Sequence, residues 1–277
     1  MVAVQKVITM TAWRRSDYFK QVIDSLNSCE GIEDYFLIVA VDAGYPKEQK
    51  EMERILNESG LNHLCLLREQ NYGCAKNTLD VLKRGFEQAD RVIHVEDDTV
   101  LHPLALRWFE HNLERFEHDE RIFSVSGYVN GELNANSLDG DWTESNIVGI
   151  RDNFNCWGWA TWKRVWEEIG DKGFGTTWKA GFNGTNCGWG KDFLSAVNRE
   201  DAGSWAWPMN RYWRKKRFEI APHTSFIQNI GLERGVWATK EIFLYKSHTD
   251  WFSPEKNDAF PLDYFFVDDF LDDLGAE

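Results

Sequence analysis

Three consecutive acidic residues, Glu96, Asp97 and Asp98, directly follow the apolar run 92–95. Adjacent carboxylates repel one another unless water solvates them or a cation binds them. A hard divalent ion such as Mg²⁺ or Mn²⁺ takes oxygen ligands and bridges carboxylates to substrate phosphates. A solvated acidic loop is the competing interpretation of this triplet. Its position at the end of an apolar strand favours a metal and phosphate site.

Asp42 is a second acidic group at the end of an apolar run, residues 35–41. In a dinucleotide-binding fold an acid at this place binds the ribose, but that fold also needs a G-x-G-x-x-G loop after its first strand. The corresponding segment here, residues 11–15, reads TAWRR and has no glycine. The sequence therefore disfavours an NAD enzyme and leaves open a nucleotide bound through Arg14 and Asp42.

Alternating strand-like and helix-like segments must position these residues. Apolar runs predict strands at 4–10, 35–41, 61–67 and 91–95, and helical patterns lie at 16–28, 47–58 and 74–87. This alternation is typical of a mostly parallel α/β sheet, in which ligands bind at the carboxyl ends of the strands. We therefore expect Asp42 and the acidic triplet at the same edge of the sheet.

The pattern changes after Phe116. Short strands are expected at 122–129, 147–150 and 218–221, and a helix at 205–216. The segment 170–203 is rich in glycine and aromatic residues, has no clear period and is expected to form long ordered loops. Trp162 and Trp166 are four residues apart on an expected helix, where core packing is the favoured interpretation.

The composition excludes several classes of function. A net charge of −14 over 277 residues argues against a nucleic-acid-binding protein, which needs a basic surface. No apolar run approaches the roughly 20 residues that cross a bilayer, and the N-terminus lacks the layout of a signal peptide, so we expect a cytoplasmic protein. Most of the 14 tryptophans are expected in the core, but an excess in one region suits stacking on sugar rings or on a base.

Five segments resemble, in order, the GT-A glycosyltransferases, and most closely the N-acetylglucosaminyltransferase I type and its bacterial relatives. They are TAWRR at 11–15, VDAGYPKE at 41–48, CAKNTLDVL at 74–82, HVEDDTVLHP at 94–103 and IRDNFNCWGWATWKRVW at 150–166. The resemblance implies a GT-A fold, a Rossmann-like and mostly parallel sheet flanked by helices, followed by a loop-rich acceptor-side part. It implies one domain, with a nucleotide-binding half at 1–117, a donor-sugar and acceptor half at 118–240 and a tail at 241–277.

The resemblance also implies an activity. The enzyme would transfer a sugar from a nucleotide-diphosphate sugar, with UDP favoured, to a glycan or another hydroxyl acceptor, and would use Mn²⁺ or Mg²⁺. Asp98 would be the direct metal ligand, and His248 a later metal or phosphate ligand. The transferred sugar or the acceptor would meet Arg151, Asp152, Trp157, Gly158 and Trp159. The nucleotide would meet Thr11, Arg14, Asp42, Lys76, Asn77, Glu96 and Asp97.

The catalytic base is where this chain departs from the family pattern. An inverting enzyme needs a carboxylate that takes the proton of the acceptor hydroxyl. Relatives place an Asp in a Trp-Asp context where this chain has Ala206. Asp192 is the favoured alternative, followed by Asp201 or Glu200, and an enzyme without such a base, retaining or inactive, stays open.

Two other classes of protein compete with this interpretation. A nucleotidyltransferase should carry a glycine-rich, basic loop after its first strand, and this chain has none. A carbohydrate-binding protein that kept the fold without catalysis would also suit the tryptophan-rich segment 157–213. Release of free nucleotide from UDP- and GDP-sugars, measured with and without Mn²⁺, distinguishes an enzyme from a binding protein.

Overall fold

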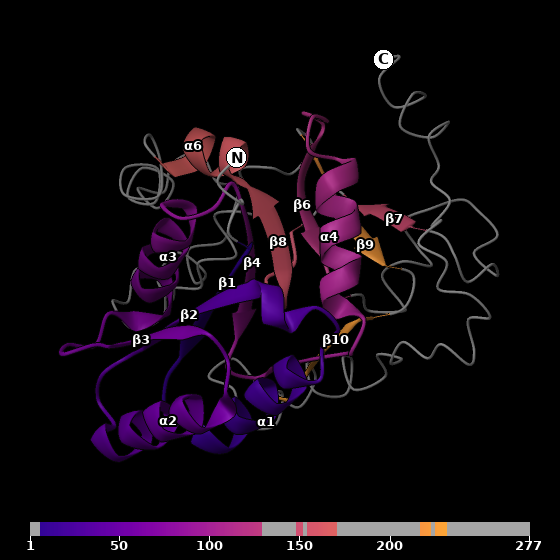
Figure 1. Ribbon diagram of the computed structural model, residues 1–277. Coiled ribbons are helices and arrows are strands. Elements are labelled where there is room, and N and C mark those ends of the chain that lie inside the picture. Colours follow the sequence, from indigo (N-terminus) through magenta and orange to yellow (C-terminus); the bar gives the residue numbers. More distant parts are fainter. Residues whose placement is uncertain (1–5, 129–147, 152–153, 171–216, 223–224, 232–277) are drawn as a thin grey trace, which may run out of the picture.

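The computed structural model describes residues 6–128, 148–151, 154–170, 217–222 and 225–231 (Figure 1). Within these ranges, eight strands form one sheet in the order β3-β2-β1-β4-β8-β6-β9-β7. The strands in this order are β3 His63–Leu67, β2 Tyr35–Val41, β1 Lys6–Ala12, β4 Arg91–Glu96, β8 Trp159–Trp162, β6 Ile122–Ser126, β9 Phe218–Pro222 and β7 Val148–Arg151.

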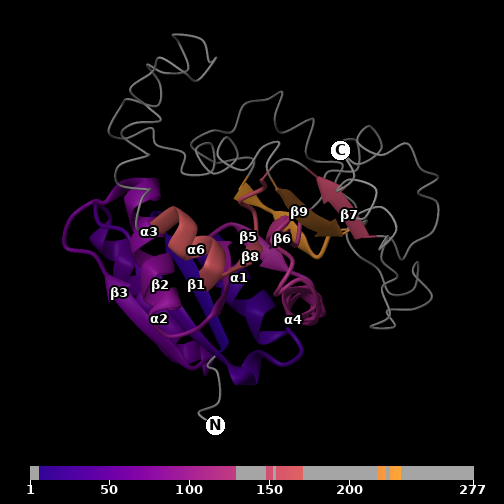
Figure 2. The ribbon, with the colours of Figure 1, turned by 90° about the horizontal axis from the view of Figure 1, so that it is seen from above.

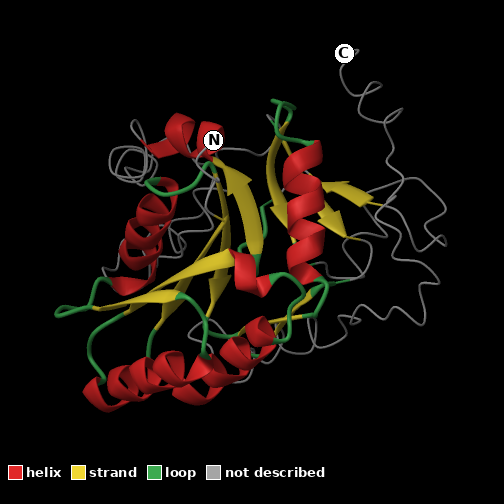
Figure 3. Cartoon of the chain, viewed as in Figure 1, coloured by secondary structure: helices red, strands yellow, loops and turns green. Residues whose placement is uncertain are grey.

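The first four strands of this order run parallel to one another. In β1, β2 and β4 almost every residue is buried, as expected for parallel strands that are covered on both faces. Three amphipathic helices make the crossovers between them, and Figure 3 shows them flanking the sheet. They are α1 Ser16–Asn27, α2 Pro46–Ser59 and α3 Gly73–Phe86.

Helices cover both faces of the sheet. In Figure 1, α1 and α2 lie on one face and α3 on the other. The view from above in Figure 2 places α6, Lys163–Gly170, beside α3. There the ring of Trp166 stacks on the ring of Phe86, with centroids 5.3 Å apart. A further helix, α4 Ala105–Arg115, packs on β6 and β8.

The later part of the chain extends the same sheet. Strand β8 pairs antiparallel with both β4 and β6, while β9 runs parallel to β6 and antiparallel to β7. A separate two-stranded ribbon joins β5, Thr99–Leu101, to β10, Ile227–Asn229. This ribbon carries residues 230 and 231 back to the turn that follows β4.

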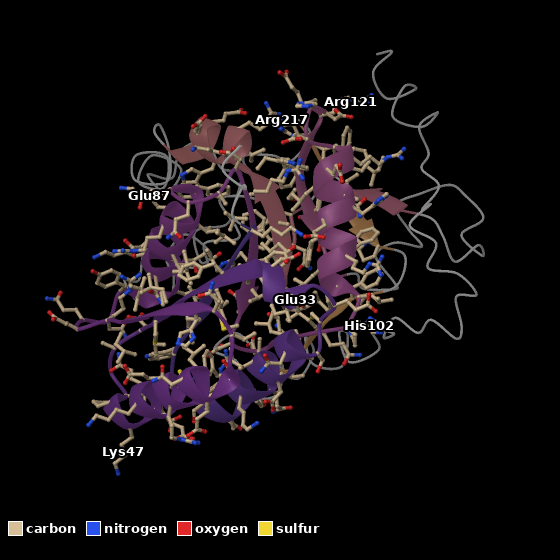
Figure 4. All side chains as sticks on the ribbon, in the orientation of Figure 1. Glu33, Lys47, Glu87, His102, Arg121 and Arg217 are labelled. Atoms are coloured by element: carbon tan, nitrogen blue, oxygen red, sulfur yellow. The ribbon has the colours of Figure 1, made fainter. Side chains whose placement is uncertain are left out.

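The two ends of the strands form two distinct edges of the molecule. Figure 4 shows Arg121 and Arg217, which precede β6 and β9, at the amino edge, and the Phe218 N–H donates to the Arg121 carbonyl at 2.7 Å. His102, which follows β5, lies at the opposite end in the same view. No helix in the described part of the chain is long and apolar enough to cross a membrane.

The expected mostly parallel sheet with flanking helices is confirmed, with one correction. Trp162 is the last residue of β8, not part of a helix, and its Nε1–H donates to the Leu113 carbonyl at 2.8 Å in the core. The elements α4, β5, β8 and β10 were not predicted from sequence. The expected helix at 205–216 and most of the expected loops at 170–203 lie outside the described residues.

Candidate active site

The carboxyl edge of the parallel strands gathers the acidic residues predicted from sequence. Thr11 near the end of β1 pairs with Ala40 in β2 and with Glu96 at the end of β4. The Asp42 N–H donates to the Ala12 carbonyl at 2.8 Å, so the chain just after β2 stays attached to the end of β1. Parallel strands of similar register therefore bring the 11–15 segment, Asp42 and the acidic triplet to one place.

Asp97 and Asp98 form a buried pair of carboxylates joined by Arg15. The Arg15 guanidinium donates to Asp97 and lies 2.8 Å from Oδ2 of Asp98. The Trp13 N–H also donates to Asp97, at 3.1 Å. Asp97 is 4% exposed and Asp98 is 8% exposed, so these charges lie where water screens them poorly. Two negative charges and one positive charge thus share a nearly dry site.

The pKa values of this cluster reflect burial and mutual charge. Burial raises the pKa of the Asp98 carboxyl, the Arg15 guanidinium opposes the rise, and the Asp97 charge adds to it, so that the pKa reaches about 6. Burial also disfavours the charged form of Arg15, but the charges of Asp97 and Asp98 outweigh this and raise the pKa of Arg15 above its usual value. Arg15 therefore remains cationic here.

One carboxylate oxygen of the pair has no partner in the described part of the chain. Among the described residues, Oδ1 of Asp98 has no hydrogen-bond partner although it is fully buried. The Ile230 N–H donates to the Asp98 carbonyl at 2.8 Å and brings Gly231 against the carboxylate. A Cβ placed on Gly231 would lie 2.0 Å from Oδ2 of Asp98, so only glycine fits beside this side chain.

Glu96 begins the acidic turn with its backbone held in place. Its N–H donates to Oγ1 of Thr99, and the Thr99 hydroxyl donates back to the Glu96 carbonyl, each at 2.9 Å. These two reciprocal hydrogen bonds between Glu96 and Thr99 fix the turn that contains Asp97 and Asp98. Within the described ranges, no three His, Cys, Asp or Glu side chains lie close enough together to hold a metal ion by themselves.

Asp42 accepts backbone hydrogen bonds from the start of α3. Its Oδ1 accepts the N–H groups of Ala43 at 2.9 Å and Tyr72 at 2.8 Å, and its Oδ2 accepts that of Gly73 at 2.8 Å. A carboxylate at a helix N-terminus satisfies N–H groups that have no partner in the helix and interacts favourably with the helix dipole. Asp42 therefore joins β2 to α3.

The other predicted nucleotide residues on α3 differ in how they are held. Asn77 is buried, donates to the Ala40 carbonyl at 3.0 Å and accepts from Nε of Arg68 at 2.9 Å. Lys76 is exposed, and its ammonium lies 3.9 Å from the centre of the Tyr72 ring. Lys76 is free to reach a ligand at the edge, whereas both ends of the Asn77 amide already bind the protein.

An aromatic pair beside Asp42 was not predicted from sequence. Nε1 of Trp13 donates to the Ala43 carbonyl at 3.0 Å, and the Trp13 and Tyr45 rings meet edge to face at 5.4 Å. The Arg14 guanidinium lies 4.8 Å from the centre of the Trp13 ring. Tyr45 is 42% exposed, which makes it one of the few exposed large hydrophobic residues in the described ranges. The pair offers an apolar surface next to Asp42.

The residues assigned to the sugar or acceptor side are only partly described. Trp157 is half-buried and meets the Tyr128 ring edge to face at 4.9 Å, whereas Trp159 lies in the core of β8. Gly158 has φ 64°, and a Cβ there would lie 2.7 Å from the Ile227 side chain. The backbone of Arg151 ends β7. Asp152, Asp192, Glu200, Asp201 and His248 lie outside the described residues.

Glu219 is a buried acid that sequence reasoning missed. It is the second residue of β9 and has no exposed surface. Its carboxylate accepts the Ser124 hydroxyl at 2.6 Å and the Asn155 N–H at 3.1 Å. Asn155 lies in the segment that leads to Trp157, so Glu219 anchors that segment to the sheet. A single acid among apolar neighbours in a short strand was the available signal.

Comparisons with known proteins bear on the fold. No protein-family model and no curated protein matches the sequence. Among solved structures, the chain is similar to S. aureus TarS 1–349, with 12% identity over 91% of this chain and 68% of that chain and a TM-score of 0.50.

Two further solved structures match less of the chain. The mannosyltransferase PcManGT from Pyrobaculum calidifontis, in complex with GDP-Man and Mn²⁺, has 13% identity over 61% of this chain and 48% of its own, with a TM-score of 0.45. S. aureus TarS 1–349 in complex with UDP-GlcNAc has 18% identity over 44% of this chain and 33% of its own, with a TM-score of 0.37. At these identities the likeness concerns architecture. The chain has the GT-A fold.

Proposed function

We propose that this chain is a metal-dependent glycosyltransferase that transfers a sugar from a nucleotide-diphosphate sugar, with UDP favoured, to a hydroxyl group of a glycan or another acceptor. One observation carries the proposal. The carboxylates of Asp97 and Asp98 are buried at the carboxyl edge of the parallel strands, and Oδ1 of Asp98 has no hydrogen-bond partner among the described residues. Ligands of open α/β sheets bind at this edge.

The residues present fit a divalent cation. Mg²⁺ and Mn²⁺ prefer oxygen ligands, and Mg²⁺ in particular is bound through one or two carboxylates together with substrate phosphates. Asp98 would hold the cation through Oδ1, the oxygen without a hydrogen-bond partner among the described residues. Asp97 would lie beside the cation, and the donor diphosphate would complete the ligand set. Such a cation offsets the negative charge that develops on the diphosphate as the sugar leaves.

Asp42 and the aromatic pair would bind the nucleoside. An ionised carboxylate offers about four acceptor sites, and Asp42 uses three of them within the protein, which leaves one for a ribose hydroxyl or a base N–H. Trp13 and Tyr45 supply the adjacent apolar surface. Arg14 lies over Trp13 and would reach the nucleotide from the same side.

Trp157 and its neighbours would form the sugar side of the site. A partly exposed aromatic ring can offer a face to the apolar C–H groups of a sugar, and Trp157 is partly exposed. Arg151 and Asp152 would lie near the transferred sugar, as the family resemblance implies. TarS 1–349, which shares the fold, has been crystallised with UDP-GlcNAc, and this likeness supports a nucleotide-sugar donor.

The decisive experiment is release of free nucleotide from UDP- and GDP-sugars, with and without Mn²⁺, by the wild type and the Asp98→Ala variant. The wild type should release nucleotide only with Mn²⁺, and Asp98→Ala should lose both the activity and cation-dependent donor binding. Asp24→Ala, an exposed acid on α1, is the matched control and should behave as wild type. Metal-dependent donor binding that survives in Asp98→Ala would show that the metal is held elsewhere.

The catalytic base is tested separately. Asp192→Asn and Asp201→Asn should each be assayed for donor affinity and transfer rate. The variant that lacks the base should lose roughly a hundredfold or more in rate while donor binding stays nearly intact. A normal rate in Asp192→Asn would reject the favoured assignment. Acceptor binding without any turnover by the wild type would instead indicate a carbohydrate-binding protein.

A further inference from the structure

Arg15 is the cationic partner of the acidic pair. Its guanidinium contacts both Asp97 and Asp98, and its side chain is only 19% exposed. The guanidinium also lies 5.5 Å from the centre of the Tyr18 ring. Without a cation, Arg15 is the group that neutralises this pair among the described residues.

The charges explain why such a group is needed. Two carboxylates buried side by side repel each other strongly, since little water screens them. A buried charge without a partner is costly, and one guanidinium with several donors reduces that cost for both acids at once. The three side chains together keep one net negative charge, which still attracts a divalent ion.

We propose that Arg15 is the resident counter-ion of the Asp97–Asp98 pair, and that it leaves Asp98 when a divalent cation binds there. This inference rests on the proposed function, because the cation is the one that donor binding would use. Oδ2 of Asp98 contacts Arg15, while the buried Oδ1 has no hydrogen-bond partner among the described residues, so a cation bound at Oδ1 would compete with Arg15 for the same carboxylate.

Two features allow Arg15 to leave Asp98 without becoming a buried charge that has no partner. Asp97 continues to hold it, because the guanidinium carries five N–H donors and uses different nitrogens for the two acids. The Tyr18 ring gives the cationic group a favourable surface beside the pair. Once released from Asp98, the guanidinium would add a positive charge beside the donor diphosphate that shares the cation. Arg15 thereby weakens binding of the cation alone and favours binding of the cation together with diphosphate.

The first test is direct Mn²⁺ binding, measured by electron paramagnetic resonance without any nucleotide. Arg15→Met should bind Mn²⁺ roughly tenfold more tightly or better than the wild type, because removal of a nearby positive charge strengthens the attraction of the pair for the ion. Arg121→Met removes the same charge at the amino edge of the sheet, at the opposite end of the strands from the acids, and should stay within about twofold of wild type. Equal or weaker Mn²⁺ binding by Arg15→Met, including no binding by either protein, overturns the proposal.

A second pair of variants keeps the test valid if Arg15→Met does not fold. Asp97→Asn and the double variant Asp97→Asn/Arg15→Met both lack one acid of the buried pair. Removal of Arg15 in the double variant therefore leaves only the Asp98 carboxylate without its cationic partner. The double variant should bind Mn²⁺ more tightly than Asp97→Asn, and Mn²⁺ should raise its melting temperature by more. The reverse order rejects the role of Arg15. A wild type that binds Mn²⁺ but never cleaves a nucleotide sugar would reject the proposed function and leave this inference standing.

Discussion

Asp42 and Gly73 are separated by 31 residues in the chain, and the Gly73 N–H donates to Oδ2 of Asp42 at 2.8 Å. With the Tyr72 N–H on Oδ1, this contact ties the end of β2 to the first turn of α3. The residue that is expected to bind the nucleotide is therefore also a structural one. Loss of its carboxylate should affect stability and ligand binding together.

The Asp42→Ala variant separates these two roles. It should unfold in urea with a free energy lower by about 1–2 kcal/mol, the usual range for loss of a helix N-cap. Affinity for UDP and for UDP-sugars should fall by a similar amount, on the order of 1–3 kcal/mol in each case, as for a hydrogen bond to a charged group. Asp42→Asn retains one acceptor oxygen and should lose less of both. A loss confined to the sugar-bearing ligand would remove Asp42 from the nucleoside pocket.

Gly231→Ala tests the close approach of the chain to Asp98. The added Cβ would collide with the carboxylate, and overpacking of this kind costs about 1–3 kcal/mol. Mn²⁺ binding should weaken as well, because the carboxylate must rotate away. In Gly231→Ala/Asp98→Ala the two closest contacts, at 2.0 and 2.6 Å, are absent and only a 2.8 Å contact with the Asp98 Cβ remains. A double-mutant cycle by urea unfolding should therefore show a coupling of at least about 1 kcal/mol. Additive effects would mean that the segment 230–231 does not press on Asp98.

Glu219 should matter for the segment around Asn155. Glu219→Leu leaves the Ser124 hydroxyl and the Asn155 N–H without their acceptor, at a cost on the order of 2–4 kcal/mol for the two groups. Glu219→Gln keeps an acceptor oxygen and should lose clearly less. Urea unfolding gives the stability, and hydrogen exchange of the Asn155 amide should accelerate in the leucine variant before the rest of the sheet. Unchanged exchange at Asn155 would show that Glu219 does not anchor that segment.

His94 predicts how stability depends on pH. Burial lowers its pKa to about 3, below the ordinary value of about 6.5, and its Nδ1 lies 3.0 Å from the Thr9 hydroxyl. Between these two values the unfolded chain binds a proton that the folded chain does not. This contribution to stability is therefore complete above pH 6.5 and decreases as pH falls, by up to about 1.4 kcal/mol per unit.

Urea unfolding between pH 7 and pH 4 measures this contribution. His94→Gln lacks the titrating group and should show a smaller loss of stability toward acid than the wild type. His118→Gln removes an exposed histidine and serves as the control, with a pH profile like that of wild type. Parallel profiles for His94→Gln and wild type would contradict the assignment of His94 as a buried neutral imidazole.

The sequence predicted the position of the acids better than their partners. Asp42 and the acidic triplet end apolar runs, and parallel pairing alone brings such ends together. Residue types in TAWRR do not tell which arginine turns toward the acids, because that choice depends on how the chain leaves β1 and enters α1. Arg15, directly before α1, contacts the acids, while Arg14 stacks on Trp13.

Elements formed by distant residues were harder to predict. Strand β8 is four residues long and is followed at once by α6, so its period is indistinguishable from the start of a helix. Strands β5 and β10 exist only through pairing with each other across 126 residues, from Leu101 to Ile227. Glu219 can be buried in β9 because Ser124 and Asn155, which are distant in sequence, donate hydrogen bonds to its carboxylate.

The place of β8 in the sheet has a consequence for folding. Strand β8 lies more than 60 residues after β4 in the chain, yet it pairs with one edge of β4. In β4, Val92, Ile93 and Val95 are all buried. A chain that ends after Phe116 would leave that side of β4 as an unpaired apolar edge, which is a template for pairing with other copies. We therefore expect the halves on either side of residue 117 to unfold as one cooperative unit, and the isolated first half to aggregate.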